Sequence, residues 1–307
     1  MHTHPGRVFI NQYGSINGPE DVERFSAFLR KEAGIDDEPP VDLSAILRRF
    51  GAPTPKRVTL PGQQGLLLDP ELGLILIEER DRPVRQRFTV AHELVEMLFA
   101  AMPARLDAHG RNVGNFPHLT KERLCNVGAA ELLMPAATFL SRTQKLGVSF
   151  DTARALAIEY EVSLAASLIR MATIGPGHQA VVLWRMKNKP SEIKSQVPEN
   201  QLLLIEIPML RIAPQKLRVE WSFTGAEMPF IPKDKSVPDN TLINAAWRDR
   251  HFVAGSEHLD LGTLSGDFYV ENQPFETEGE WQVLSLLHFP VMLDASEDCQ
   301  GTCDGCR

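Results

Sequence analysis

The fold of the chain is decided by one stretch near the end of its first third: Arg85-Gln86-Arg87-Phe88-Thr89-Val90-Ala91-His92-Glu93-Leu94-Val95-Glu96. Apolar residues recur at helical spacing through this stretch, and Asp81 and Pro83 precede it as a helix start signal. The sequence therefore predicts a helix that carries His92, Glu93 and Glu96. Because residues four positions apart on a helix share one face, we expect His92 and Glu96 to be neighbours.

These three polar residues form the pattern H-E-x-x-E, which differs by one residue from H-E-x-x-H. In H-E-x-x-H, two histidines on one helix face bind a divalent metal, and the intervening glutamate acts as a general base. A second interpretation treats the charges as a solvated stripe on an amphipathic core helix. The pattern by itself does not separate a metal site from such a stripe.

A second predicted helix supplies further candidate ligands. Pro135 cannot continue this helix, whose sequence is Glu122-Arg123-Leu124-Cys125-Asn126-Val127-Gly128-Ala129-Ala130-Glu131-Leu132-Leu133-Met134. Glu122 and Asn126 lie four residues apart. If this helix packs against the first, it presents Glu122 to a metal and Asn126 to the far ring nitrogen of His92. Such a contact fixes the tautomer and orientation of a ligating imidazole.

Taken together, the two segments resemble the ImmA/IrrE family of metallo-endopeptidases, whose helices read R-x-R-F-T-x-A-H-E-x-x-H and E-x-x-x-N-x-x-A-A-x-x-L-M-P. The resemblance covers residues 60–172 and is nearest to the radiation-response regulator proteases of that family. It implies a zincin-like domain in which His92 and Glu122 bind zinc and Glu93 is the general base. The remaining family ligand falls on Glu96. The resemblance also implies a helix-turn-helix transcriptional repressor as the substrate.

Glutamate at position 96 changes the expected chemistry of the site. One imidazole and two carboxylates are formally neutral with a divalent ion, whereas two imidazoles and one carboxylate leave one positive charge. We therefore expect a weaker Lewis acid, and oxygen-rich ligation makes manganese or iron(II) alternatives to zinc. Two interpretations stay open: a working metallo-endopeptidase, and a non-proteolytic regulator that retains the peptidase fold and docks to a repressor.

Stabilising the transition state requires another hydrogen-bond donor, for which the nearby histidines His118 and His109 are candidates. His118 lies four residues before Glu122, so it is also a candidate replacement for the missing histidine ligand. Ordinary surface positions explain both residues equally well, because their spacing is not diagnostic.

Composition narrows the class of protein. The chain has 307 residues, of which 43% are hydrophobic and 23% charged, which is typical of a globular protein. It lacks a long apolar run and the basic and apolar regions of a signal peptide, so we expect a cytoplasmic protein without a membrane partner. Its net charge of -8 argues against direct DNA binding, because the phosphate backbone favours clustered Lys and Arg.

We predict an α+β protein with a peptidase domain and N-terminal helices at residues 1–140, a helix-turn-helix segment at 141–175, a strand-rich domain at 176–295 and a cysteine tail at 296–307. The family resemblance implies that the first domain is zincin-like and that the strand-rich domain is sensor-like. The pattern predicts helices at 21–33 and 41–50, and a hairpin at 65–68 and 74–77 belonging to a small antiparallel sheet. In the helix-turn-helix segment, we expect helices at 156–162 and 163–171, with Ser163 as the N-cap. Strands are expected at residues 180–185, 202–207, 216–223, 268–270 and 281–287.

The tail concentrates three of the four cysteines, Cys299, Cys303 and Cys306, in a C-x3-C-x2-C cluster. In a cytosolic protein such spacing indicates metal binding more than a disulfide. The cluster predicts either a [4Fe-4S] centre or a second zinc completed by His288 or another chain. A frayed tail with ordinary thiols is the alternative, and Cys125 is predicted to be a small core residue.

Overall fold

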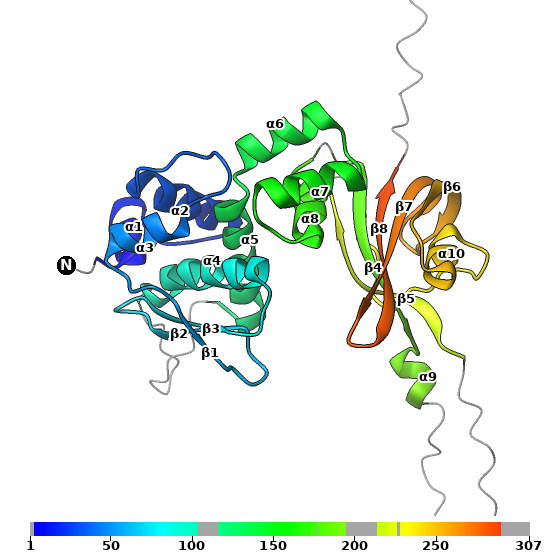
Figure 1. Cartoon of the computed structure of the whole chain (residues 1–307), viewed down its shortest axis with the longest axis horizontal. Helices are drawn as coiled ribbons and strands as arrows, with labels where there is room; N and C mark the ends of the chain where they lie inside the picture. The colour runs from blue at the N-terminus through cyan, green and yellow to red at the C-terminus, as the bar shows by residue number, and fades with distance from the viewer. Residues whose placement is uncertain (1–2, 104–115, 176, 195–213, 226–227, 290–307) are drawn as a thin grey trace, which may run out of the picture. The chain divides into compact units, whose positions relative to one another are not determined.

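The structure is a computed structural model that describes residues 3–103, 116–175, 177–194, 214–225 and 228–289 (Figure 1). It divides into two compact units between Met171 and Ala172. The first unit is mainly helical with one small sheet, and the second is built on a larger sheet. The chain therefore has the α+β architecture that its sequence predicts.

An aromatic cluster holds the first three helices together. Phe9 on α1 lies 5.2 Å from Phe25 and 5.5 Å from Phe28 between ring centroids, and Phe28 lies 6.2 Å from Phe50 on α3. The sequence predicts α2 and α3, and both predictions are confirmed, whereas α1 was not predicted. The bounds are α1 (Pro5–Tyr13), α2 (Pro19–Glu32) and α3 (Leu43–Phe50).

The small sheet has the strand order β1-β3-β2 and contains the predicted hairpin. Its strands are β1 (Lys56–Val58), β2 (Gly65–Asp69) and β3 (Leu74–Glu78). The hairpin strands β2 and β3 pair antiparallel, as expected, while β1 pairs parallel with β3. The sheet is therefore mixed, because the unpredicted strand β1 adds a parallel edge.

The two motif helices, α4 (Pro83–Ala100) and α5 (His118–Leu133), pack side by side in the core of the first unit. Their contact is close because Gly128 has no side chain. A Cβ atom at Gly128 would lie 2.6 Å from Val22 Cγ1 on α2 and 2.7 Å from Val95 Cγ1 on α4. Gly128 thus lets α5 approach both neighbours, which fixes the spacing between the residues of the two motifs.

Pro135 ends α5, as the sequence predicts, and serves as the N-cap residue of α6 (Ala136–Leu146). The two helices meet at a bend of 68°. Among the described helices, none is individually long and apolar enough to cross a membrane, and α5 and α6 meet those criteria only as a bent pair.

Two further helices, α7 (Phe150–Glu159) and α8 (Leu164–Ile174), follow in the region where the sequence predicts a pair of helices. The Ser163 hydroxyl accepts a hydrogen bond from the Ala166 N–H at 3.1 Å, so Ser163 caps α8 as expected. The first helix was wrongly placed, since α7 begins at Phe150 and not at Leu156. Its start is fixed by Ser149, whose hydroxyl accepts the Thr152 N–H at 3.1 Å.

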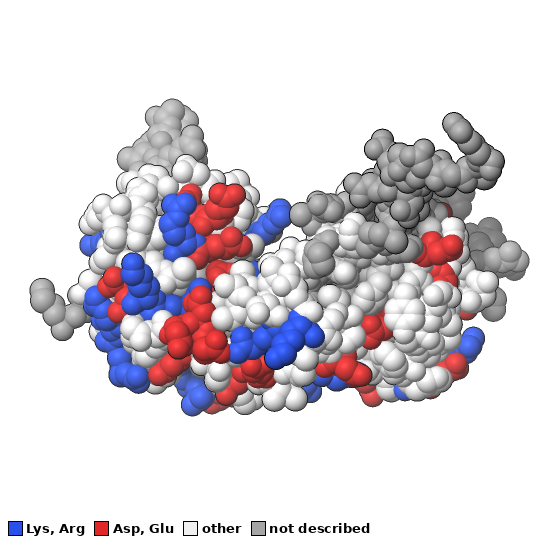
Figure 2. Space-filling view, turned by 90° about the horizontal axis from the view of Figure 1, so that it is seen from above, with Lys and Arg blue, Asp and Glu red and all other residues white. Residues whose placement is uncertain are grey.

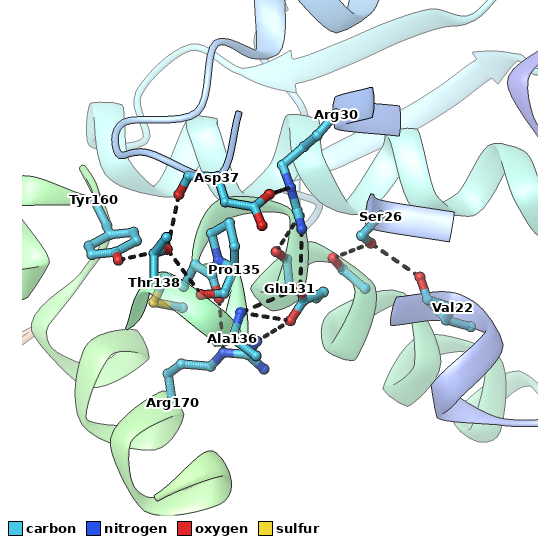
Figure 3. Close-up of polar contacts among 12 residues, drawn as sticks. Val22, Ser26, Arg30, Asp37, Glu131, Pro135, Ala136, Thr138, Tyr160 and Arg170 are labelled. Carbon is cyan, nitrogen blue, oxygen red and sulfur yellow. Dashed lines mark hydrogen bonds and ion pairs between the residues drawn. The ribbon is translucent and has the colours of Figure 1, made fainter. Parts of the chain in front are cut away.

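A buried ion network joins α2, α5 and α8 (Figure 3). Arg30 donates from Nη2 to Glu131 Oε1 at 3.2 Å, from Nη1 to the Glu131 carbonyl at 2.8 Å and from Nε to Asp37 Oδ1 at 2.7 Å. The other Glu131 oxygen pairs with Arg170 Nη2. Arg170 also donates from Nε to the Met134 carbonyl at 3.1 Å. Each guanidinium is therefore balanced by a carboxylate, which buried charges require.

The second unit is an antiparallel sheet with the order β5-β4-β8-β7-β6. Helix α10 packs on one face around Trp184, whose indole N–H donates to Ser285 Oγ at 2.9 Å. The predicted strands at 180–185, 216–223, 268–270 and 281–287 are confirmed, while 202–207 lies outside the described residues. The bounds are β4 (Gln179–Lys187), α9 (Pro190–Lys194), β5 (Lys216–Thr224), α10 (Leu242–Asp249), β6 (Val253–Asp260), β7 (Ser265–Thr277) and β8 (Glu280–His288).

Candidate metal centre

Three predicted ligands converge where α4 packs on α5. His92 and Glu96 come from α4 and Glu122 comes from α5, and one ligand atom of each lies within 4.8 Å of the others. His92 Nε2 is 3.5 Å from Glu122 Oε2. All three residues are half-buried, so their donor atoms are partly shielded yet reachable. The structure thus brings together the set that the sequence predicts, and we call it the His-Glu-Glu cluster.

Asn126 orients the imidazole of His92. Its Oδ1 lies 3.1 Å from His92 Nδ1. Since an amide oxygen only accepts hydrogen bonds, this contact places a ring proton on Nδ1 and directs Nε2 towards Glu122. An imidazole nitrogen and two carboxylates form a donor set for a divalent ion, and the ring tautomer matches that use. The residues therefore fit a divalent metal.

Glu93 lies next to this cluster but faces the sheet. It is only 6% exposed. Burial, followed by the negative charge of Glu96, raises the pKa of Glu93 to about 7, against an opposing hydrogen bond from the backbone of Leu67 on β2. A carboxyl group in this state exchanges protons readily near neutral pH, which is the property that a general base and acid require.

Strand β2 reaches Glu93 because Gly65 begins it. A Cβ atom at Gly65 would lie 2.2 Å from Thr89 Cγ2 and 2.8 Å from Glu93 Oε1. Both distances are too short for any side chain, so the glycine permits the strand to pass directly over the carboxyl group. Gly65 was not predicted as a site residue, although a glycine directly before an apolar strand can mark a close backbone approach.

Lys121 was also missed from sequence. Its ammonium group donates to Glu96 Oε1, linking α5 to α4 within the cluster. One sequence feature could have identified Lys121, because it directly precedes the predicted ligand Glu122. In a site where Glu96 adds a second carboxylate, a neighbouring cation is a candidate partner. Glu96 is therefore paired with a cation in this structure.

The remaining candidates lie elsewhere. His118 is the first residue of α5 with its side chain 81% exposed, and its Nε2 is 3.7 Å from Glu122 Oε1, so it borders the cluster without joining it. Cys125 is fully buried, as predicted, and burial raises the pKa of its thiol. His288 pairs with Glu271 at 3.1 Å. His109, Cys299, Cys303 and Cys306 lie outside the described residues.

Known proteins match this part of the chain. Residues 55–172 match the family described as the IrrE N-terminal-like domain. The radiation response metalloprotease IrrE of Deinococcus deserti is 38% identical over 112 residues, which are 36% of this chain and 40% of that protein. IrrE of Deinococcus radiodurans is 35% identical over 109 residues, which are 35% of this chain and 33% of that protein. The matches span less than half the length of either relative.

One solved structure is similar in fold over a larger part of the chain. A Mycobacterium tuberculosis transcriptional regulator aligns with a TM-score of 0.55 and 12% identity, covering 93% of this chain and 80% of that one. At this identity the likeness concerns the fold alone. The motif helices and the sequence matches agree on the same segment, so residues 55–172 are similar both to the IrrE N-terminal-like domain and to the IrrE metalloproteases.

Proposed function

We propose that the chain is a site-specific cytoplasmic metallo-endopeptidase that cleaves a helix-turn-helix transcriptional repressor during a stress response. The observation that carries this proposal is Glu93, a buried carboxyl group with a raised pKa beside the His-Glu-Glu cluster. Beyond the effect of burial, Glu93 lies close enough to Glu96 and Glu122 for their negative charges to raise its pKa, which supports the role of general base. The names of the relatives, radiation response metalloproteases, support the reaction class and the stress role.

The residues divide the proposed reaction between them. A divalent ion, when bound, supplies a Lewis acid for the scissile carbonyl. His92, Glu96 and Glu122 would hold that ion, with zinc the first candidate and manganese or iron(II) the alternatives that two carboxylates favour. A Glu93 carboxylate oxygen takes a proton from the attacking water and returns it to the leaving amine.

Strand β2 offers a surface for the substrate backbone. Among the described residues β2 pairs only with β3, so β2 is an edge strand of the small sheet. Leu66 and Leu68 on β2 are exposed, whereas Leu67 between them is buried and its backbone contacts Glu93. An extended peptide added to this edge would lie next to the proposed general base.

Two observations support a protein substrate over direct DNA binding. Arg170, the only arginine of α8, is 5% exposed and engaged with Glu131 and the Met134 carbonyl, so it is not available to phosphates or bases. On the face in Figure 2, basic side chains of the first unit are interspersed with acidic ones. Reading DNA generally requires a clustered basic surface.

Cleavage of a purified helix-turn-helix repressor tests the proposal. The intact chain, supplied with zinc or manganese, should cut the repressor at a single site that mass spectrometry identifies. Glu93→Gln should abolish cutting while leaving metal content unchanged, because it removes the base and retains the ligands. Glu159→Gln, a surface change far from the cluster in sequence, is the matched control. Cleavage that survives Glu93→Gln contradicts the assignment.

The pairing of Glu96 with Lys121 favours a second candidate function, a non-proteolytic regulator that retains the fold and docks to a repressor. Glu96→His separates the two. If Glu96 has impaired the site, this change should raise both metal affinity and cleavage. If Glu96 is a working ligand for another ion, the change should alter metal preference instead.

We also propose that Cys299, Cys303 and Cys306 hold a metal or an iron-sulfur cluster that gates the peptidase. The support is their spacing in the sequence. Iron, zinc and acid-labile sulfide should be measured on anaerobically purified chain and on the triple Cys→Ser variant. Loss of metal in the variant supports a tail site, while equal contents in both proteins contradict it.

A further inference from the structure

Lys121 occupies a position inside the His-Glu-Glu cluster that the proposed mechanism does not use. Its ammonium group bonds to Glu96 Oε1, across the interface between α5 and α4. The side chains of Lys121 and Glu96 are 29% and 25% exposed, so both are largely removed from solvent. An ion pair with this burial is screened less than a surface pair.

The pairing changes the charge that an incoming metal ion meets. Two carboxylates alone would attract a divalent cation strongly, but one of them already faces an ammonium group. Within the part of the chain that the structure describes, the partners of Glu122 are imidazoles, His92 at 3.5 Å and His118 at 3.7 Å. A cation that binds all three ligands must therefore share Glu96 with Lys121, and the two positive charges repel each other at close range.

We propose that Lys121 is a resident cation that shares Glu96 with the bound metal ion and so keeps metal affinity low, an inference that rests on the proposed metal site. The same positive charge has a second effect. With a divalent ion bound, one imidazole, two carboxylates and one ammonium group together leave one formal positive charge. Two imidazoles and one carboxylate leave the same charge, so Lys121 offsets the extra anionic ligand.

The test is metal affinity, measured by competition with a chelating indicator on the metal-free full chain. Zn²⁺ and Mn²⁺ are titrated in turn, and only the binding that His92→Ala removes is counted, which excludes other sites. Lys121→Gln removes the charge but keeps an N–H donor near Glu96, and Lys121→Met removes both. Each should tighten both metals at least about tenfold, because a close like charge is lost. Lys121→Arg should bind like the wild type.

Arg123 provides the matched control, since it is a neighbouring cation on the same helix but exposed to solvent. Arg123→Met should change affinity less than about threefold, as a screened surface charge does. In a Glu96→Gln background, Lys121→Gln should bring a smaller gain, because the shared carboxylate is gone. Thermal unfolding of each metal-free variant verifies that it is folded.

The outcomes are distinguishable. Tighter binding in both charge-removing variants, with Arg123→Met unchanged, supports the proposal. Unchanged or weaker binding in Lys121→Gln overturns it and leaves the peptidase proposal intact, as does an equal gain in Arg123→Met. If no variant binds metal in a His92-dependent way, the peptidase proposal itself fails and this inference fails with it.

Discussion

Replacing Glu131 with glutamine should destabilise the first unit strongly, because Glu131 balances two buried guanidinium groups. The side chains of Arg30 and Arg170 are 3% and 5% exposed, and that of Glu131 is 10% exposed. Glutamine removes the negative charge that both guanidinium groups contact, so the buried network loses one unit of negative charge. Removing one partner of a buried pair costs about 3–5 kcal/mol.

Urea denaturation followed by circular dichroism measures this free energy of unfolding. For a unit of this size, the loss corresponds to a fall in Tm of about 6–20 °C. Glu159→Gln is the control, since Glu159 pairs with Arg142 at 2.8 Å but is 42% exposed. Glu159→Gln should lower the free energy of unfolding by less than about 1 kcal/mol. A Glu131→Gln variant within about 1 kcal/mol of the wild type would refute the reasoning, because the network would then contribute no more than a surface pair.

Three further predictions concern residues that surround the His-Glu-Glu cluster. Burial raises the pKa of Glu93 from 4.5 to about 7, so Glu93 stabilises the folded metal-free chain below pH 4.5 and this contribution is lost as the pH rises through 7. Relative to Glu93→Gln, unfolding titrations should show a loss of about 3 kcal/mol between pH 4 and 8, and parallel profiles would contradict the burial argument. Gly65→Ala should lower the free energy of unfolding in denaturant by about 1–3 kcal/mol, because the new Cβ would overlap Thr89. Gly18→Ala is the control, since the space around its Cβ is open. If Gly65→Ala is as stable as the wild type, β2 can shift to accommodate the methyl group. Asn126→Ala should weaken zinc binding about 10- to 100-fold in a chelator competition by releasing the His92 ring, and an unchanged affinity would show that the ring is held by other contacts.

Local patterns in the sequence were sufficient to predict the two motif helices and the start of α8. The apolar periodicity around His92 and the stop at Pro135 predict α4 and α5, and Ser163 predicts the start of α8. Strand β1 escaped prediction because Lys56–Val58 contains a single apolar residue and depends on pairing with β3. Short elements of this kind are defined by tertiary contacts, which a local pattern does not encode.

For the cluster, too, local sequence patterns predict some residues and tertiary packing determines the others. His92, Glu122 and Asn126 were predicted because four-residue spacing on each helix and one packing contact bring them together. The pairing of Lys121 with Glu96 depends on the rotation of α5 about its axis, which a helical pattern sets only roughly. Gly65 and Glu93 meet through the packing of a strand on a helix, and no sequence spacing relates them.

Helix α5 carries both the metal cluster and the buried ion network. Glu122 lies in its first half and Glu131 in its last turn, which along a helix is a separation of about 13 Å. An α-helix is stiff over this length, so α5 acts as a rigid rod clamped at one end by Arg30 and Arg170. The contacts that hold Glu131 therefore also fix the axis of the helix that presents Glu122 to the cluster.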